Sequence, residues 1–275
     1  MKDYSMSTQE TSVTPTGKSG PVLLRVFNQD RFAGLVVVAL IILALQIASQ
    51  FAPHYIAPPP VLIAEKLWTQ LTSLWDEILI TLLRLAIALA FAMLIGTILG
   101  IVMGMLPRIR PYVRSLVVID TGIPALSWML IAVFWFREPE IRIFFIMSVI
   151  LVPFYALNVF DGIRSLPKEW LEMCESFRPN RWQVLRYLIL PHIIAYVFST
   201  TRSVIGYATR MVIFAELIAS AVGIGAQMGL AQANFDIASV FAWTLFLVVL
   251  NIFSQFLVAL LEKRVLRYRP EVEVR

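Results

Sequence analysis

The stretch E-M-C-E-S-F-R-P-N-R-W-Q-V-L-R-Y-L-I-L-P, residues 172–191, guides the interpretation of the whole chain. It is the longest charged, amphipathic segment between two long apolar segments. The spacing from Lys168 to Phe177 predicts a helix, and Pro179 ends it because proline has no backbone N–H. Asn180 is a suitable cap for a second helix from Arg181 to Leu188. The sequence therefore predicts a basic helix–turn–helix on a membrane surface, directly before a transmembrane helix.

Composition places the chain in a membrane. Of its 275 residues, 59% are hydrophobic and only 15% are charged, and the mean hydropathy is +0.78. The apolar segments have the length of helices and lack the roughly ten-residue alternating pattern of barrel strands. The single cysteine, Cys174, excludes an internal disulfide framework. The predicted fold class is all-α, a polytopic membrane protein.

Six apolar segments are long enough to form transmembrane helices. They cover residues 32–51, 78–106, 115–136, 143–163, 192–220 and 238–261. The transmembrane domain is therefore predicted over residues 32–262. A mobile polar tail is predicted at residues 1–31 and a basic tail at residues 263–275.

Two connecting segments have patterns of their own. Ala57-Pro58-Pro59-Pro60 predicts a stiff, extended connector, and Val61 to Leu74 predicts an amphipathic helix at the membrane interface. Residues 223–229 are rich in glycine and are predicted to form an external loop.

Lys and Arg residues are distributed asymmetrically. If the N-terminus is inside, most of the 23 lie in the two tails and in the 107–114 and 164–190 loops. The external segments then hold only Lys66, Arg137 and Arg142. The positive-inside rule therefore predicts six spans with both termini cytoplasmic.

Charged residues inside the predicted spans are costly and need a partner or water. Arg210 at mid-bilayer costs at least ~2.5 kcal/mol unless it is paired or hydrated. Two interpretations stay open: Arg210 faces a cavity and attracts an anion, or it pairs with Asp120, Asp161 or Glu216. Glu216 lies six residues further along, a poor spacing for a pair on one helix. Arg84 is expected to snorkel to the interface.

Small residues and helix breakers mark two of the spans. Gly96, Gly100 and Gly104 recur every four residues and form a smooth ridge that lets another helix approach closely. Packing within the chain and contact between two copies fit this ridge equally well. Gly122 and Pro124 interrupt the third span and free backbone groups that protein or water must satisfy.

Residues 172–191 resemble the cytoplasmic EAA loop of ABC-importer permeases, which reads Glu-Ala-Ala, three residues, Gly, nine residues, Ile, one residue, Leu-Pro. The corresponding residues are Glu172, Met173, Cys174, Arg178, Leu188, Leu190 and Pro191. The acidic first residue, the apolar residue at position 188 and the Leu-Pro pair match the family pattern in position, whereas both alanines are replaced. Arg178 stands where the family has a glycine that tolerates positive φ, so the turn at Arg178-Pro179-Asn180 can differ from the family's.

Further motifs extend the resemblance over roughly Ala57 to Glu262. They are A-P-P-P at 57–60, I-P-A-L-S-W at 123–128, Trp135-Phe136 followed by Glu140, Ala215-Glu216, and Gly223-Ile224-Gly225. Together they are similar to the nitrate/sulfonate/taurine branch of these permeases. The resemblance implies a type I permease of the bacterial inner membrane that works as a homodimer or a heterodimer. Its implied partners are two ATP-binding subunits, which hold ATP and Mg, and an external solute-binding protein.

The resemblance also implies residue roles. Coupling to the ATPase is expected at Glu172, Met173, Cys174, Ser176, Arg178, Pro179, Arg181, Leu190 and Pro191. The solute pathway, lined by spans three to five, has the candidates Asp120, Pro124, Trp128, Asn158, Tyr207, Arg210 and Glu216. ATP-driven closure would push the loop, and its helix pair would transmit rigid-body rocking. Glu172 either pairs with a basic residue of the ATPase or caps its own helix.

The chain has no motif for chemistry of its own. It has no Walker A lysine motif, no H-E-x-x-H and no Cys/His cluster, and His54 and His192 are isolated. We therefore expect a transport subunit that is not an enzyme, contacts lipid, binds no nucleic acid and holds no cofactor. A secondary transporter or channel would work alone but should show an inverted repeat, and a scaffold would not need the proline breaks. The expected solute is small and anionic, such as a sulfonate, nitrate or bicarbonate, although larger organic solutes also fit.

Overall fold

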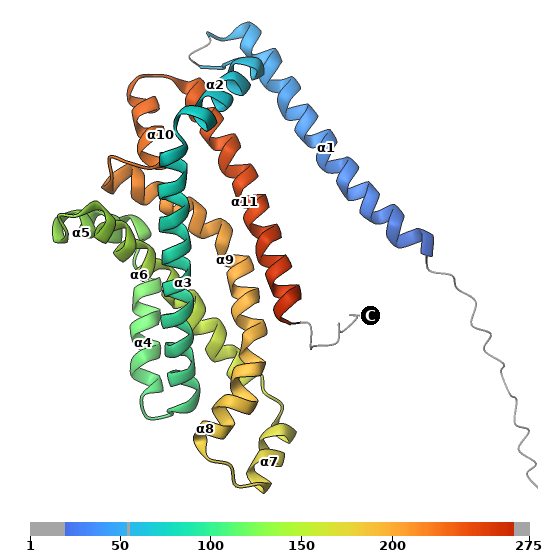
Figure 1. The fold of residues 1–275 in the computed structure, drawn as a ribbon, viewed down its shortest axis with the longest axis vertical. Coiled ribbons are helices and arrows are strands. Elements are labelled where there is room, and N and C mark those ends of the chain that lie inside the picture. Colours follow the sequence, from blue (N-terminus) through green and yellow to red (C-terminus); the bar gives the residue numbers. More distant parts are fainter. Residues whose placement is uncertain (1–19, 54–55, 267–275) are drawn as a thin grey trace, which may run out of the picture. The chain divides into compact units, whose positions relative to one another are not determined.

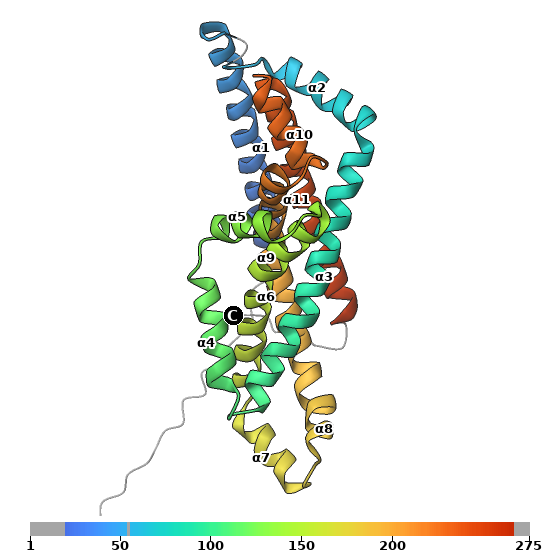
Figure 2. The same cartoon turned by 90° about the vertical axis from the view of Figure 1, so that its left-hand side faces the viewer.

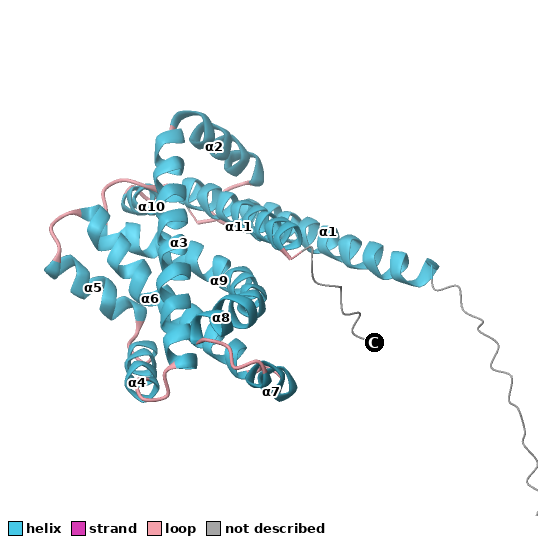
Figure 3. Ribbon diagram, turned by 60° about the horizontal axis from the view of Figure 1, so that its bottom comes forward, coloured by secondary structure: helices cyan, strands magenta, loops and turns pink. Residues whose placement is uncertain are grey.

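The computed structural model describes residues 20–53 and 56–266, and all regular structure in them is helical (Figure 3). The chain divides into two compact units, residues 1–53 and residues 54–275. Each unit is described by itself. Most of the predicted N-terminal tail and most of the basic C-terminal tail lie outside the described residues.

The first unit holds one long helix, α1 (Gly20–Phe51). Among the described residues its apolar part is Val36–Phe51, which is shorter than the roughly 20 residues that span a bilayer. The side chains described along this part are mostly exposed, as expected for a helix that meets lipid. The helix begins at Gly20, within the residues predicted as a polar tail.

The second unit is a bundle of helices (Figure 1). Its elements are α2 (Pro60–Ser73), α3 (Trp75–Met105), α4 (Arg110–Thr121), α5 (Ala125–Trp135), α6 (Pro139–Arg164), α7 (Lys168–Ser176), α8 (Arg181–Gln183), the π-helix η1 (Val184–Ile189), α9 (Leu190–Ala219), α10 (Ile224–Ala233) and α11 (Ile237–Val265). Helices α7 and α8 lie at one end of this bundle, and α2 and α10 lie at the other (Figures 1 and 2). These ends are called the α7/α8 end and the α2/α10 end below.

Helices α3, α6 and α9 pack against one another and form the centre of the bundle. The buried side chains there include Met147, Leu151 and Tyr155 of α6. The glycines predicted to form a ridge lie on α3 against α6: a Cβ added at Gly96 would come within 2.5 Å of the Tyr155 Cβ. Gly100 and Gly104 meet α6 in the same way, so packing within the chain accounts for the ridge.

Four helices in the described residues are long and apolar enough to cross a membrane. They are Trp75–Met105, Pro139–Arg164, Arg181–Ala219 and Ile237–Val265. Helices α4 and α5 add a fifth if the bent pair counts as one span. The all-α, multi-pass fold class is confirmed.

The third predicted span is broken by 94° between α4 and α5. Figure 2 shows α5 lying across the direction of α4. Pro124 lies at the break in an extended conformation, with φ −58° and ψ 135°, and cannot donate an N–H to continue α4. The sequence predicted the place of the interruption, and the structure adds that α5 packs on α6 and α9 beyond the bend.

The glycine-rich loop predicted at residues 223–229 is wrong, because most of this segment belongs to α10. Gly223 starts the helix with φ +111°, a conformation that side chains other than glycine rarely adopt. Gly225 lies inside the helix, and a Cβ there would come within 2.3 Å of the Ile213 carbonyl oxygen, so only glycine fits this close contact. These glycines seat α10 closely on α9 and do not make the segment flexible.

Candidate functional site: a coupling segment, a solute cavity and a buried charge network

The segment that resembles the EAA loop folds as a helix pair at the α7/α8 end. Its first helix is α7 and its second is α8. Asn180 directly precedes α8, and the Asn180 backbone N–H donates to the Gln183 Oε1 over 2.7 Å. Arg178, between the helices, has φ +49°. The chain therefore makes a left-handed turn at the position where the family has glycine, and it does so with an arginine.

The second helix does not end at Leu188 as predicted. It passes through η1 into α9 without a break, so Arg181–Ala219 forms one long helical segment. Pro191 explains the π-helical turn, because it has no N–H for the Tyr187 carbonyl and its ring would clash with that group in a regular α-helix. The N–H of Leu190 instead donates five residues back, to the Leu185 carbonyl.

Residues 168–191 are named the coupling segment after this resemblance, and several of their large apolar side chains are exposed. Phe177 is 81% exposed and Tyr187 is 73% exposed, and Met173 and Trp182 are also exposed. Such a group of exposed apolar residues in a short segment is typical of an interaction surface.

The acidic and small residues of the predicted coupling set lie on the same segment. The Glu172 side chain is exposed, and its carbonyl accepts a hydrogen bond of 3.1 Å from the Ser176 hydroxyl. Glu172 is the fifth residue of α7, so the alternative in which it caps its own helix is wrong. The Cys174 side chain lies outside the described side chains. Leu190 packs on the core around Ile189 at this end.

A cavity of about 470 Å³ lies beside the break between α4 and α5. Asp120 and Trp128 line it together with Trp135, Phe145 and Pro153. Its volume lies within the roughly 300–1,000 Å³ typical of small-molecule sites, and its walls are mainly apolar and aromatic. This cavity is called the aromatic cavity below.

A smaller space of about 90 Å³ adjoins the same residues. Asp120 and Trp128 line both spaces, and Tyr207 of α9 lines the smaller one. The Tyr207 ring contacts the Phe154 ring in a tilted arrangement, with 5.5 Å between the ring centroids. Three of the predicted pathway residues, from three different helices, therefore meet in one place.

The other predicted pathway residues lie elsewhere. Pro124 is exposed at the start of α5, and the exposed Asn158 donates its side-chain N–H to the Phe154 carbonyl over 2.8 Å. Arg210 is exposed and donates to the Gly206 carbonyl over 3.2 Å. No carboxylate among the described side chains lies within 4.0 Å of Arg210, so the predicted ion pair is not formed in this structure.

Glu216 instead belongs to a buried charge network at the α2/α10 end. Its side chain is 0% exposed, and it accepts hydrogen bonds from Arg84 over 2.8 Å, from the Thr81 hydroxyl over 2.9 Å and from the Gly225 N–H over 2.9 Å. These donors satisfy a carboxylate that would otherwise be very costly to bury. Glu216 is therefore a fixed part of the scaffold in this structure.

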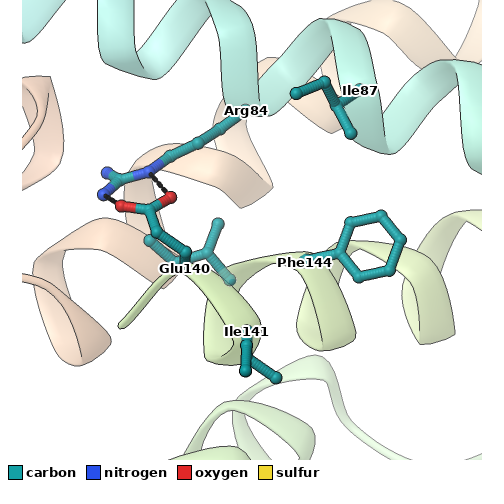
Figure 4. Close-up of a pocket in the computed structure, with 6 residues that line it drawn as sticks. Arg84, Ile87, Glu140, Ile141 and Phe144 are labelled. Atoms are coloured by element: carbon teal, nitrogen blue, oxygen red, sulfur yellow. Dashed lines mark hydrogen bonds and ion pairs between the residues drawn. The ribbon is translucent and has the colours of Figure 1, made fainter. Parts of the chain in front are cut away.

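Arg84 joins three helices through this network. Besides Glu216 on α9, it contacts Glu140 on α6 with two nitrogens, and it donates to the Val222 carbonyl over 2.8 Å. Figure 4 shows the Arg84 guanidinium and the Glu140 carboxylate facing each other. The prediction that Arg84 snorkels to the interface is wrong, because the residue is buried and its charge is neutralised inside the protein.

Neighbouring polar groups tie the start of α10 to α3. The Glu77 carboxylate accepts from the Gly223 N–H and from the Gln227 side chain, and the Thr81 hydroxyl accepts from the Ile224 N–H over 2.9 Å. Sequence reasoning missed Glu77 and Thr81 because they are far from α10 along the chain. The available signal was the presence of Arg84, Glu140 and Glu216 in or beside apolar spans, since such charges usually pair.

Among the residues that the structure describes, no group of three or more His, Cys, Asp or Glu side chains could hold a metal ion. The site offers an apolar cavity with one acidic group, a network that fixes one end of the bundle and an exposed helix pair at the other end. This arrangement fits binding and movement, and no nucleophile with an adjacent base stands out in it.

Comparison with known proteins agrees with this geometry. Residues 92–267 match the family described as "Binding-protein-dependent transport system inner membrane component". The riboflavin transport system permease protein RibX of Chloroflexus aurantiacus is 31% identical over 218 residues, which are 78% of this chain and 81% of that protein. The taurine transport system permease protein TauC of Escherichia coli is 26% identical over 176 residues, 61% of this chain and 64% of that protein.

A solved structure shows the same fold. It is a bacterial ABC transporter involved in the import of the acidic polysaccharide alginate, with a TM-score of 0.62 at 16% identity over 88% of this chain and 98% of that chain. The likeness at this identity concerns the fold alone. The chain belongs to the binding-protein-dependent transport system inner membrane components, as an ABC-importer permease of the nitrate/sulfonate/taurine branch.

Proposed function

We propose that this chain forms the solute pathway of an ATP-driven importer together with a second permease subunit, and that two ATPase subunits act on the α7–α8 pair. The observation that carries the proposal is the continuous segment from Arg181 to Ala219. It starts at the exposed helix pair, passes Tyr207 at the wall of the small cavity and contains Glu216 in the buried network. A push on α8 therefore has a stiff helical connection to both places.

The proposed movement is a rotation of packed helices as a unit. Arg84 and Glu216 hold α3 and α9 together at the α2/α10 end, so a push from the α7/α8 end would move these helices jointly. The aromatic cavity lies where the bent pair α4–α5 meets α6, which is where such a movement would change access. Solute would be delivered at the α2/α10 end by an external binding protein.

The proposed orientation follows from charge. The positive-inside rule places the basic α7/α8 end in the cytoplasm, together with both chain termini. ATP and Mg would be held by the partner subunits. A homodimer is the simpler assembly, and a heterodimer in which another chain carries the glycine-containing loop is the alternative.

The solute has two candidates, each favoured by one observation. A small anion, such as a sulfonate, nitrate or bicarbonate, is favoured by Arg210, an exposed cation on α9 without a carboxylate within 4.0 Å among the described side chains. A flat aromatic solute is favoured by the aromatic cavity, where Trp128 and Trp135 lie beside the Phe145 ring at centroid distances of 6.0 and 5.8 Å. The similarity to RibX supports the second candidate.

The coupling proposal is tested by purifying the chain with its co-purifying partners and measuring ATPase activity. Glu172→Ala should detach the ATPase or uncouple its activity from solute. Glu169→Ala is the matched control, because Glu169 is another exposed acid on α7 but lies in its first turn. If the chain purifies alone with no nucleotide-sensitive partner, a secondary transporter, a channel or a scaffold becomes the better explanation.

The solute is tested by uptake into proteoliposomes that contain the whole transporter and its binding protein. Arg210→Gln should reduce uptake of a sulfonate if the solute is an anion, and Trp128→Ala should reduce uptake of a flavin if the solute is aromatic. Each substitution serves as the control for the other candidate. A solute whose uptake responds to neither substitution does not use this pathway.

A further inference from the structure

A second large cavity, of about 550 Å³, lies at the α7/α8 end. Its walls come from the end of α3, the end of α6 and the helical segment α8–η1. Figure 1 shows these three parts at the same end of the bundle. The cavity is separate from the aromatic cavity, with which it shares no lining residue. It is called the basal cavity below.

The basal cavity is apolar where it meets the core. Leu166 and Ile189 are buried in the core cluster of this end, and Met105, Ile163 and Val184 pack against that cluster. All five residues also line the cavity. Its inner wall is therefore suited to hydrocarbon, and a small hydrated anion would gain nothing from it.

The outer wall of the basal cavity is positively charged. Arg164 and Arg181 both line it, and both side chains are exposed. Among the described side chains, no carboxylate lies within 4.0 Å of either guanidinium. Two arginines on one rim thus have no counter-charge within this distance among the described side chains.

A third arginine adds to the positive charge. The guanidinium carbon of Arg110 lies 5.5 Å from the centroid of the Phe160 ring, and that of Arg164 lies 5.7 Å from the same centroid. The two charges can therefore be no further apart than the sum of these distances. Arg110 is fixed in place by donating to the carbonyls of Met103 and Gly104 at the end of α3. Arg110 does not line the cavity, but its positive charge adds to the attraction that Arg164 and Arg181 exert on an anion there.

We propose that the basal cavity binds an anionic phospholipid of the membrane leaflet at the α7/α8 end. Arg164 and Arg181 contact the headgroup phosphate, and one acyl chain lies along the apolar wall formed by Met105, Ile163 and Val184. The observations favour a lipid over a free phosphate because charge and apolar surface occur in the same cavity. Basic pockets between transmembrane helices on the cytoplasmic side commonly take anionic headgroups.

The position of the basal cavity gives this lipid a role. Val184 and Ile189 belong to the π-helical turn that joins the coupling segment to α9. A lipid in the cavity therefore fills the space between this turn and the α3–α4 connection. It would stiffen the junction between α8 and α9, through which the proposed movement passes. This inference concerns lipid binding by the chain and does not depend on the proposed coupling to an ATPase.

The test is lipid binding by the delipidated full-length protein, purified in neutral detergent with any partner that accompanies it. Dihexanoyl phosphatidylglycerol is titrated in, and the thermal unfolding midpoint is followed by tryptophan fluorescence. We expect the anionic lipid to raise the midpoint in a saturable manner, whereas dihexanoyl phosphatidylcholine and inorganic phosphate do not at the same concentrations. Arg164→Gln should weaken the apparent affinity for phosphatidylglycerol roughly five-fold, the effect of one arginine near a membrane surface.

Two further variants make the result specific. Arg164→Lys keeps the charge and should retain most of the affinity, which separates loss of binding from misfolding. Arg202→Gln removes an exposed arginine of α9 that does not line the cavity, and it should bind as the wild type does. Equal responses to the two lipids, a full response to inorganic phosphate, or unchanged binding by Arg164→Gln would overturn the proposal. So would loss of the lipid response whenever an ATPase partner is bound, because the occupant would then be that protein.

Discussion

The two ends of the helix bundle treat charge in opposite ways. At the α2/α10 end, Arg84 and Glu216 are buried, and each group has partners within the chain. At the α7/α8 end, Arg178, Arg181 and the large apolar side chains beside them are exposed. One end thus pairs its buried charges within the single chain, whereas the other exposes charged and large apolar groups.

This difference teaches how to interpret an intramembrane charge. From the sequence alone, Glu216 and Arg84 cannot be distinguished from residues of a solute pathway, because any charge in an apolar span is costly. Their full set of hydrogen bonds makes them part of the scaffold instead. Asp120, in contrast, lies in a cavity wall and makes no ion pair within 4.0 Å among the described side chains.

The largest expected effect is at the buried end. Glu216→Ala removes the acceptor for Arg84, Thr81 and Gly225 and leaves a buried cation with less compensation. We expect a loss of about 3 kcal/mol in the free energy of unfolding, the low end for breaking a buried ion pair, because Glu140 still faces Arg84. The measurement is equilibrium unfolding of the purified chain in detergent.

Glu140→Ala is the matched control, since the Glu140 side chain is 67% exposed and contacts the same arginine. It should cost less, about 1 kcal/mol, because water screens the exposed Glu140 carboxylate and Glu216 still pairs with the buried Arg84. The double variant Arg84→Met/Glu216→Leu should be less destabilised than Glu216→Ala alone. Equal losses for Glu216→Ala and Glu140→Ala would mean that burial does not distinguish the two pairs.

An intermediate effect is expected at the exposed end, where the left-handed turn is made by Arg178. Such a conformation costs a residue with a Cβ about 1–2 kcal/mol, and glycine avoids most of this cost. Arg178→Gly should therefore stabilise the α7–α8 turn, and hydrogen exchange of a peptide covering residues 168–191 should slow by up to about five-fold. Arg178→Ala keeps the Cβ and should not slow exchange. If alanine and glycine behave alike, the guanidinium and not the backbone sets the stability of this turn.

The smallest effect concerns a partly exposed ion pair near the α2/α10 end. The Lys66 ammonium lies 2.7 Å from the Asp236 carboxylate, whose side chain also receives bonds from Ser239 at the start of α11. Burial alone would raise the pKa of Asp236, but the donors from Lys66 and Ser239 outweigh it and hold this pKa below its usual value. The stabilisation is therefore present above the unfolded pKa of about 3.9 and is lost as pH falls through the lower folded pKa.

The side chains of Lys66 and Asp236 are 39% and 33% exposed. Solvent screening therefore limits the contribution of this ion pair to the free energy of unfolding to less than about 1 kcal/mol. The measurement is the unfolding midpoint of the wild type and of Asp236→Asn between pH 7 and pH 3. The difference should be constant down to about pH 5 and should shrink progressively as the pH falls further. Lys66→Gln should show the same pattern, and a difference that does not shrink with falling pH would assign the effect to the helix cap.

Several elements follow from local sequence. The apolar lengths predicted α3, α6 and α11 to within a few residues, because a helix must satisfy its own backbone groups in lipid. Asn180 and Pro124 marked a helix start and a helix break, since capping and the missing proline N–H act over a few residues. The glycines at 223–229 were misleading, because glycine marks both flexible loops and close contacts.

The sequence by itself therefore determined that this is an all-helical, multi-pass permease. Only the tertiary structure decided which charges pair. Arg84 and Glu216 are far apart along the chain and lie on different helices, so no spacing rule connects them. Their pairing depends on α3 and α9 packing side by side, and the closeness of α10 depends on the absence of side chains at Gly223 and Gly225. Local chemistry sets where helices begin and end, whereas close packing between distant segments sets which groups are satisfied and which remain available for function.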